Sequence, residues 1–290
     1  MSWKAEIVAE ALEFPEGPVY VGDNDLYVTE IRGGRVSRFR EGSLEDRWTT
    51  GGGPNGATLG SDGSLFIANN GGFRASEDGS GSERIDDGLT GRIQRLGPRG
   101  DLSDVAIELP GSGPHSPNDL CFGPDGLLYF TDPRWQDFGP HNPGAVHRTD
   151  LAGRVELLAE VAMFPNGIAF GPDGRLYVAE TVTKKILVYD WQPGGLGEPD
   201  LFCELPRGLP DGFCFDAEGS LVVCGSMEDT ICVFDGSGAL VDRFDAPEGS
   251  HPTNCCIGGG RLWVTYSGPG QIVCFDYAKA AHPLLTESGS

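Results

Sequence analysis

Six polar residues occupy the same place in six copies of one sequence phrase. Each copy has a proline, the polar residue directly after it, an apolar run, a turn and a second apolar run. These marker residues are Glu16, Asn55, Asn118, Asn166, Asp211 and Thr253. Their side chains offer oxygen atoms as metal ligands, and hard divalent cations, Ca²⁺ above all, take six to eight oxygens. If the fold brings the markers together, they predict a divalent-cation site.

The alternative interpretation of the markers is that each belongs to a separate turn. Asn and Asp after Pro are common turn residues. A turn role predicts free exchange among turn formers, however, and it does not explain the glutamate at the first position, Glu16. The repetition therefore favours one functional ring of residues over six unrelated turns.

The apolar runs around the markers predict about four antiparallel strands in each copy. The markers lie 39 to 63 residues apart. Asp-Gly between two apolar runs is a strong hairpin signal, and helical periodicity is nearly absent. Further strand-like runs lie between the copies, at 35–40, 91–96, 145–150, 185–190, 231–236 and 271–276. Repeats of this length and content are typical of propellers, so we predict an all-β, six-bladed β-propeller.

The chain ends are expected to complete this ring. The apolar run at 5–10 can join the last blade as its missing strand, which removes free sheet edges. We find no composition break, so residues 1–290 are expected to form a single domain. Equivalent residues of all blades then surround one channel, where the markers meet. The Gly-, Ser- and Asp-rich stretch at 75–88 is expected to be an exposed, mobile loop.

Charge and cysteine content exclude several classes of protein. The formal net charge of −22 argues against nucleic-acid binding, which needs positive charge. The eight cysteines form no CxxC motif, and most lie in apolar runs, so they are expected to be buried and reduced. Neither a leader peptide nor a membrane-length apolar run is visible. A cytoplasmic location and the absence of a membrane partner are expected.

The repeated motifs resemble those of the regucalcin/gluconolactonase family, which consists of calcium-dependent six-bladed propeller lactonases. Diisopropylfluorophosphatase is similar in the same framework. The resemblance covers nearly the whole chain in the family's order. The motifs that carry it are FPEGPVY, SPNDLCFGPDGLLYFTDP, FPNGIAFGPDGRLYVAET, LPDGFCFDAEGSL and PTNCCIGGGRLWVTYSG.

The resemblance implies roles for four of the markers. By this resemblance Glu16, Asn166 and Asp211 hold the metal, while Asn118 either completes the metal shell or binds substrate. Asp211 would also be the general base or nucleophile. The implied cofactor is one divalent cation, with Ca²⁺ expected first and Zn²⁺, Mn²⁺, Mg²⁺ or Fe²⁺ as alternatives.

Two departures from the family pattern bear on the substrate. Regucalcin-like members carry Arg where this chain has Ser116, so an anionic sugar acid is a less natural substrate. The run ANNGGFRA at 68–75 also differs from the Glu-His-Gly run of sugar lactonases.

Other polar residues near the markers are candidates for substrate binding. Side chains that could hydrogen-bond substrate hydroxyls are Asn55, Asn118 and Ser116. His115 and His251 lie within three residues of a marker, so either could reach the channel mouth, although a lone His is more often structural. Arg134 could anchor a carboxylate, with a solvated loop arginine as the alternative. Asp132 ends a second strand and is interpreted as a turn residue.

The function expected from these residues is metal-dependent hydrolysis of a small lactone, most naturally a sugar lactone, to the hydroxy acid. The same site used on a phosphotriester or an aryl lactone is one alternative. A non-catalytic interaction propeller is another, although such a protein has no need of Glu16 and Asp211 in a channel. A serine hydrolase is excluded because no G-x-S-x-G motif occurs. The sequence does not identify the oligomeric state.

Overall fold

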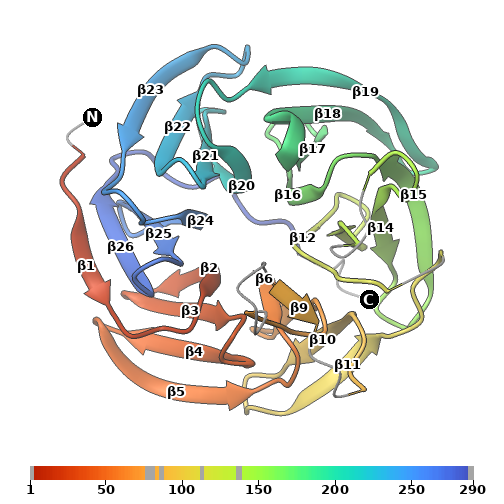
Figure 1. The fold of residues 1–290 in the computed structure, drawn as a ribbon, viewed down its shortest axis with the longest axis horizontal. Coiled ribbons are helices and arrows are strands. Elements are labelled where there is room, and N and C mark those ends of the chain that lie inside the picture. The colour runs from red at the N-terminus through yellow and green to blue at the C-terminus, as the bar shows by residue number, and fades with distance from the viewer. Residues whose placement is uncertain (1–2, 76–81, 85–87, 112–113, 135–138, 287–290) are drawn as a thin grey trace.

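Six four-stranded antiparallel sheets surround a central channel as the blades of a propeller (Figure 1). The structure is a computed structural model that describes residues 3–75, 82–84, 88–111, 114–134 and 139–286. Among these residues the only helix is the short 3-10 helix η1 (Thr181–Thr183). The all-β, six-bladed β-propeller predicted from the repeats is therefore confirmed. No helix in this part of the chain is long and apolar enough to cross a membrane.

Each blade begins with an inner strand at the channel and continues outward. The strands of blades one to three, from inner to outer, are β2 (Pro15–Gly22), β3 (Asp25–Glu30), β4 (Arg35–Arg40), β5 (Ser43–Thr49); β6 (Pro54–Leu59), β7 (Leu65–Asn69), β10 (Arg92–Leu96), β11 (Leu102–Ala106); and β12 (Leu120–Phe122), β13 (Leu128–Asp132), β14 (Gly144–Thr149), β15 (Val155–Val161). Those of blades four to six are β16 (Pro165–Phe170), β17 (Leu176–Glu180), β18 (Lys185–Gln192), β19 (Gly195–Glu204); β20 (Leu209–Phe215), β21 (Leu221–Ser226), β22 (Thr230–Phe234), β23 (Leu240–Asp245); and β24 (Pro252–Gly258), β25 (Arg261–Tyr266), β26 (Gln271–Asp276), β1 (Glu6–Ala9).

The sixth blade joins the two ends of the chain. Strand β1 pairs antiparallel with β26, with Ile7 opposite Val273. The expectation that the first apolar run completes the last blade is confirmed. Because the ring closes on itself, the inner strands hold a fixed arrangement around the channel (Figure 1).

The hydrophobic core lies between the blades. Each of six apolar clusters combines side chains of two neighbouring blades. Phe66 of blade two, for example, meets Phe122 of blade three edge to face, with ring centroids 5.2 Å apart. Alternating strand residues thus reach both neighbours, and this packing positions one blade relative to the next.

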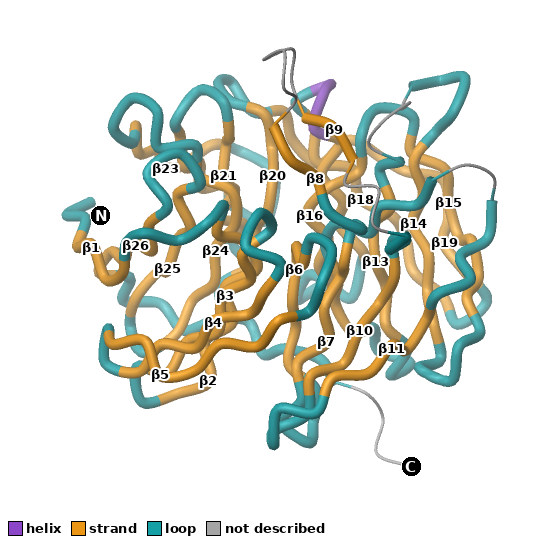
Figure 2. The backbone as a smooth tube through the Cα atoms, turned by 60° about the horizontal axis from the view of Figure 1, so that its bottom comes forward, coloured by secondary structure: helices purple, strands orange, loops and turns teal. Residues whose placement is uncertain are grey.

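The stretch expected as a loop at 75–88 contains two short strands. Strand β8 (Phe73–Ala75) pairs with β9 (Ser82–Arg84) as a separate hairpin above the second blade (Figure 2). The expectation of an exposed, mobile loop otherwise falls largely outside the described residues.

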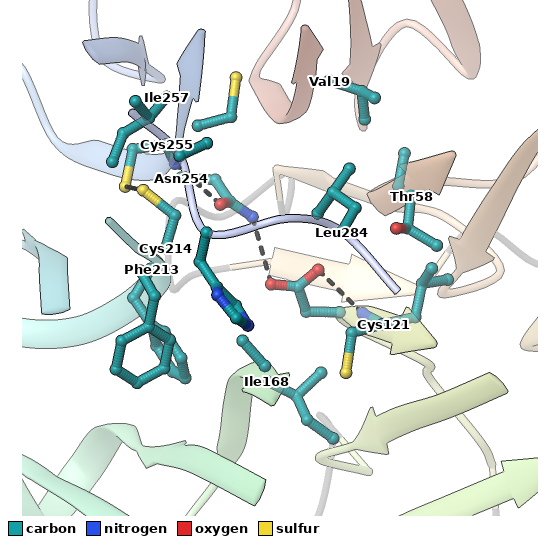
Figure 3. Close-up of a pocket in the computed structure, with 18 of the residues that line it drawn as sticks. Val19, Thr58, Cys121, Ile168, Phe213, Cys214, Asn254, Cys255, Ile257 and Leu284 are labelled. Carbon is teal, nitrogen blue, oxygen red and sulfur yellow. Dashed lines mark hydrogen bonds between the residues drawn. The ribbon is translucent and has the colours of Figure 1, made fainter. Parts of the chain in front are cut away.

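The C-terminal segment closes the channel at the face opposite this hairpin. The N–H of His282 donates to the carbonyl of Phe215 at 3.0 Å, which holds the segment on blade five. Leu284 then covers a cavity of about 150 Å³ whose wall includes Cys214 and Cys255 (Figure 3). All eight cysteines are free, and five are buried; Cys121, Cys214 and Cys256 are partly exposed, so the expected burial is confirmed in part.

Candidate functional site

The markers lie at the channel, at or just before the first residues of the inner strands. Five of them are buried, and Asp211 keeps part of its surface exposed. The backbone around them is tied from blade to blade. Hydroxyl groups of Thr29 and Thr131 donate to the carbonyls of Asn55 and Asn166 at 2.5 and 2.6 Å. At Asn55 and Asn166 the main-chain carbonyl accepts the bond, so these ties leave the marker side chain free to face the channel.

Glu16 and Asp211 approach each other across the channel. Burial raises the pKa of Glu16 well above its usual range, and the charges of Asp211 and Asp119 raise it further. Burial also raises the pKa of Asp211, against hydrogen bonds from Asn166 and Ser226 that favour its ionised form. The structure thus brings together the three residues that the resemblance assigns to the metal.

A third carboxylate, Asp119, was not among the predicted site residues. Burial raises its pKa to about 7. Its Oδ2 accepts a hydrogen bond from Nδ2 of Asn254 at 3.3 Å (Figure 3). The Asp119 and Asn254 side chains lie so close to the neighbouring inner strands that only glycine fits there. A Cβ on Gly56 would lie 2.1 Å from Oδ1 of Asp119, and one on Gly212 would lie 2.1 Å from Cγ of Asn254.

The signal for Asp119 and Asn254 was present in the repeats. The residue directly after the marker is glycine in four copies, and the two exceptions are these polar residues. Two of the four glycines, Gly56 and Gly212, leave room that the Asp119 and Asn254 side chains fill. A comparison of this second position across the copies would have identified both residues.

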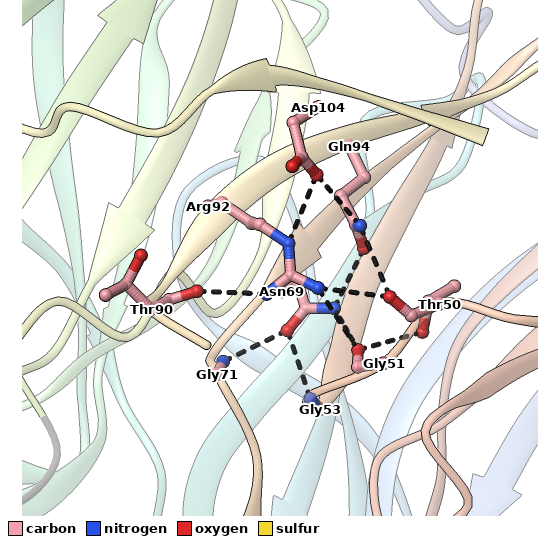
Figure 4. Close-up of polar contacts among 9 residues, drawn as sticks. All are labelled: Thr50, Gly51, Gly53, Asn69, Gly71, Thr90, Arg92, Gln94 and Asp104. Carbon is pink, nitrogen blue, oxygen red and sulfur yellow. Dashed lines mark hydrogen bonds and ion pairs between the residues drawn. The ribbon is translucent and has the colours of Figure 1, made fainter. Parts of the chain in front are cut away.

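The loop before Asn55 is held by a network of buried polar groups (Figure 4). Nδ2 of Asn69 donates to the carbonyl of Gly51 at 2.7 Å, and its Oδ1 accepts the N–H of Gly53 at 3.0 Å. Arg92 also donates to the Gly51 carbonyl, at 3.4 Å. The run that departs from the family pattern therefore supports the second marker.

The donor set in the channel fits a divalent cation. The charges of Asp211 and Asp119 raise the pKa of Glu16, and the charge of Asp119 raises that of Asp211; a cation would offset this repulsion. Oδ1 of Asn55 is buried without a hydrogen-bond partner among the described residues. The side chains that Glu16, Asn166 and Asp211 supply carry oxygen donors, as Ca²⁺ and similar cations require.

A second group of ionisable side chains lies in the third blade. Ligand atoms of His115, Asp132 and His147 all lie within 4.8 Å of one another. Nδ1 of His115 is 2.5 Å from Oδ2 of Asp132. Burial opposes ionisation of Asp132, but the nearby histidine side chains and a hydrogen bond from the Ser116 N–H lower its pKa below the usual range. These residues could hold a divalent metal, and the sequence analysis did not find His147.

The remaining candidates take up different positions. Arg134 is buried, and its Nη1 donates to Oδ1 of Asn142 at 3.0 Å, so the alternative of a solvated loop arginine is wrong. Ser116 is also buried, with its N–H bonded to Asp132. His251 is partly exposed, and its N–H donates to Asp229 Oδ1 at 2.7 Å.

Asp132 is a turn residue, as interpreted from the sequence, through only one of its two carboxylate oxygens. Oδ1 accepts the N–H of Arg134 two residues later, at 3.3 Å, as in an Asx turn. Oδ2 faces the two histidines instead.

Known proteins resemble this chain in sequence and in fold. A gluconolactonase of Zymomonas mobilis is 26% identical over 305 residues, which cover 92% of this chain and 80% of that protein. The structure of a gluconolactonase from Xanthomonas campestris superimposes with a TM-score of 0.76 at 26% identity, over 96% of this chain and 89% of that one. A calcium-binding regucalcin from Agrobacterium tumefaciens, at 19% identity, shares the fold with a TM-score of 0.78, over 99% of this chain and 98% of that one.

The family signature extends over nearly the full propeller. Residues 14–276 match the family described as the SMP-30/Gluconolactonase/LRE-like region. The matched span runs from the first marker motif to the end of β26. The resemblance inferred from the repeated motifs is confirmed, and this chain belongs to the SMP-30/gluconolactonase/LRE-like family.

Proposed function

We propose that this protein hydrolyses a small lactone with the help of a divalent cation held by Glu16, Asn166 and Asp211. Membership of a family with gluconolactonase relatives supports lactone hydrolysis. The observation that supports the cation is the convergence of three carboxylates, in which Asp211 and Asp119 raise the pKa of Glu16 and Asp119 raises that of Asp211. Ca²⁺ is the first expectation, because these groups offer oxygen.

Asp211 is the residue placed to handle the proton of the attacking water. Its partly exposed surface leaves room for a water molecule beside the carboxylate. A hydrogen bond from Asn166 favours the ionised form and orients the group. In this state Asp211 accepts a proton from water as water attacks the lactone carbonyl.

Other channel residues would bind and orient the lactone. Asn118 and Asn55 carry amide groups at equivalent blade positions and can hydrogen-bond its oxygens. A bound cation supplies polarisation of the carbonyl and stabilises the negative charge that develops on its oxygen. Asp119, bonded to Asn254, contributes negative charge near Glu16 that favours a cation in the channel.

The test is a lactone panel assayed by proton release in a weakly buffered indicator. We expect turnover of at least one pentonolactone or hexonolactone with Ca²⁺, Mg²⁺, Mn²⁺ or Zn²⁺ present, and its loss on chelation. Asp211→Asn should reduce kcat at least about 100-fold, the lower range for loss of a general base. Asp235→Asn, the same change in an exposed hairpin turn, is the matched control.

The panel also separates the alternatives. Turnover of aryl lactones or phosphotriesters alone would assign the site to another electrophile. Absence of turnover across the panel, with the cation bound, would instead favour a binding propeller and contradict the proposal.

A further inference from the structure

We propose that His115, Asp132 and His147 form a Zn²⁺ site in the third blade, separate from the cation site of the markers. The three side chains come from the segment before β12, the end of β13 and the middle of β14. Their ligand atoms lie within 4.8 Å of one another. The proposal does not depend on the lactonase function.

Strand register places two of these ligands on one face. His147 lies opposite Phe130 in the β13–β14 pair, and Asp132 follows Phe130 by two residues. Residues two apart on a strand share a face, so Asp132 and His147 are diagonal neighbours within reach of each other. The fold therefore builds the pair from two rigid central strands of the blade.

His147 is the independent observation that points to a ligand. Its side chain is fully buried, and neither ring nitrogen has a hydrogen-bond partner among the described residues. Nε2 lies 3.7 Å from Oδ2 of Asp132, beyond hydrogen-bond distance. A buried polar group without a partner is costly, and a metal ion between these atoms would satisfy the nitrogen.

Asp132 is already oriented for this role. The N–H groups of Ser116 and Arg134 donate to its Oδ1 at 2.8 and 3.3 Å. This leaves Oδ2 directed at the histidines. Metal ligands in proteins are typically held in this way by surrounding hydrogen bonds.

The donor types select Zn²⁺ over Ca²⁺. Two imidazole nitrogens and one carboxylate oxygen suit Zn²⁺, with bonds of roughly 2.0–2.2 Å and water in an open position. Tetrahedral ligand atoms are then about 3.3–3.5 Å apart. Oδ2 of Asp132 lies 2.5 Å from Nδ1 of His115 and 3.7 Å from Nε2 of His147. On binding the ion, His115 would therefore have to move further than His147. His115 is the least buried of the three, which gives it room to move.

Zn²⁺ binding requires one proton to move. Nδ1 of His115 now shares a proton with Oδ2 of Asp132. To offer its lone pair, the neutral ring carries its proton on Nε2 instead, and no net charge is created on the histidine. The ion would tie the segment that carries His115, Ser116 and Asn118 to the blade, and so fix one wall of the marker channel.

The experiment uses the full chain carrying Asp211→Ala, which removes a ligand of the marker site and leaves the third blade intact. Zn²⁺ affinity is measured by titration of the metal-free protein, and the ligands of bound Zn²⁺ by X-ray absorption. We expect one Zn²⁺ with two imidazole ligands. His147→Phe, which preserves the packing on Phe130, should weaken this binding at least about 100-fold.

Two further variants make the result decisive. His141→Gln removes an exposed histidine of the same blade and should leave Zn²⁺ affinity unchanged. His115→Gln tests the site at a partly exposed position if His147→Phe does not fold. The proposal is overturned if bound Zn²⁺ shows no imidazole ligands, or if neither variant of the cluster weakens binding. Because the marker site is disabled throughout, these outcomes are independent of lactone hydrolysis.

Discussion

Three buried carboxyl groups determine the electrostatics of the channel. Burial raises the pKa values of Asp119, Asp211 and Glu16, and neighbouring carboxylates raise those of Asp211 and Glu16 further. A cation bound among them would stabilise the ionised carboxylates and lower their pKa values. The metal-free protein should therefore behave differently from the cation-bound protein whenever pH changes.

The stability of the metal-free protein should fall as pH rises from about 4 to about 7. The pKa of Asp119 is about 7 in the folded chain and 3.8 for the ordinary side chain. In this window the native state binds more protons than the unfolded state, so unfolding becomes easier by up to about 1.4 kcal/mol per pH unit. Denaturation at several pH values with chelator present measures this slope.

Asp119→Asn is the control, since it cannot titrate and should flatten the slope. Saturating Ca²⁺ should also flatten it in the wild-type chain. Equal slopes for wild type and Asp119→Asn without metal would contradict the assignment.

Arg134 should act on substrate binding rather than on the chemical step. Ser116 stands where regucalcin-like relatives have arginine, and Arg134 is the buried cation in the same blade. A charge-assisted hydrogen bond of about 1.5–3 kcal/mol predicts that Arg134→Ala raises KM at least about tenfold, with a smaller effect on kcat.

Steady-state kinetics on the best lactone measures both constants for the Arg134 variant. Arg175→Ala, at an exposed turn, controls for loss of positive charge, and thermal melting checks that Arg134→Ala still folds. An unchanged KM would remove Arg134 from the site and favour a neutral substrate.

Part of the candidate site could be predicted from the sequence. Glu16, Asn166 and Asp211 could be predicted to converge because they share a repeat position, and the propeller makes such positions neighbours. His147 could not, because its partner depends on the register between β13 and β14. An apolar pattern predicts that both strands exist but does not determine which residues face each other.

At the scale of elements, hydroxyl groups join the second strand of one blade to the inner strand of the next. Thr131 on β13 donates to the carbonyl of Asn166 on β16, and Thr29 on β3 does the same for Asn55 on β6. At the closure of the ring, Thr253 donates to the carbonyl of Pro15 at 2.9 Å. These bonds fix the backbone at which the markers enter the channel.

Thr131→Val should destabilise the protein by about 1–3 kcal/mol, the cost of leaving a buried polar group unsatisfied. The substitution keeps the shape of the side chain but removes the donor to Asn166 and the acceptor for the N–H of Asp119. Chemical denaturation measures the loss. Thr131→Ser retains the hydroxyl and should recover most of it; equal losses in both variants would assign the effect to packing.

The strands themselves were predictable for a physical reason. Alternating apolar residues and Asp-Gly turns are local signals, and six copies of them reinforce one another. The hairpin of β8 and β9 was not predicted, because three-residue strands in a polar stretch carry almost no apolar pattern. The inter-blade hydroxyl bonds were also invisible, since they join residues about 26 to 35 positions apart.

At the scale of the whole molecule, the two ends of the chain act on opposite parts of the ring. Strand β1 closes it laterally through β26, and the C-terminal segment covers the channel from the face opposite the markers (Figure 2). Leu284 lies over the cavity that contains Cys214 and Cys255 (Figure 3). The segment thus separates the buried thiols from solvent.

Deleting residues 278–290 should make the cavity cysteines react with a thiol reagent. Burial raises the pKa of the Cys121 thiol, so little Cys121 thiolate is present in the full chain. Opening the cavity to water reverses this effect for Cys121 and Cys214, which both line it. Mass spectrometry after timed alkylation identifies the modified residues. Deleting only 287–290 is the control, and protection that survives the longer deletion would show that the segment is not the cover.

The glycines that follow four of the markers, together with the main-chain ties, have a consequence for how such proteins diversify. At Asn55 and Asn166 the tie is made to the main-chain carbonyl, so the marker side chain can be exchanged with little effect on the scaffold, whereas Thr253 itself bonds Pro15. Each blade contributes one such position, and the six are encoded far apart in the chain. Recombination of whole blades between relatives would therefore shuffle ligands and substrate contacts independently. A library randomised at the other five markers, with Thr253 kept, is a compact route to new specificities on an unchanged fold.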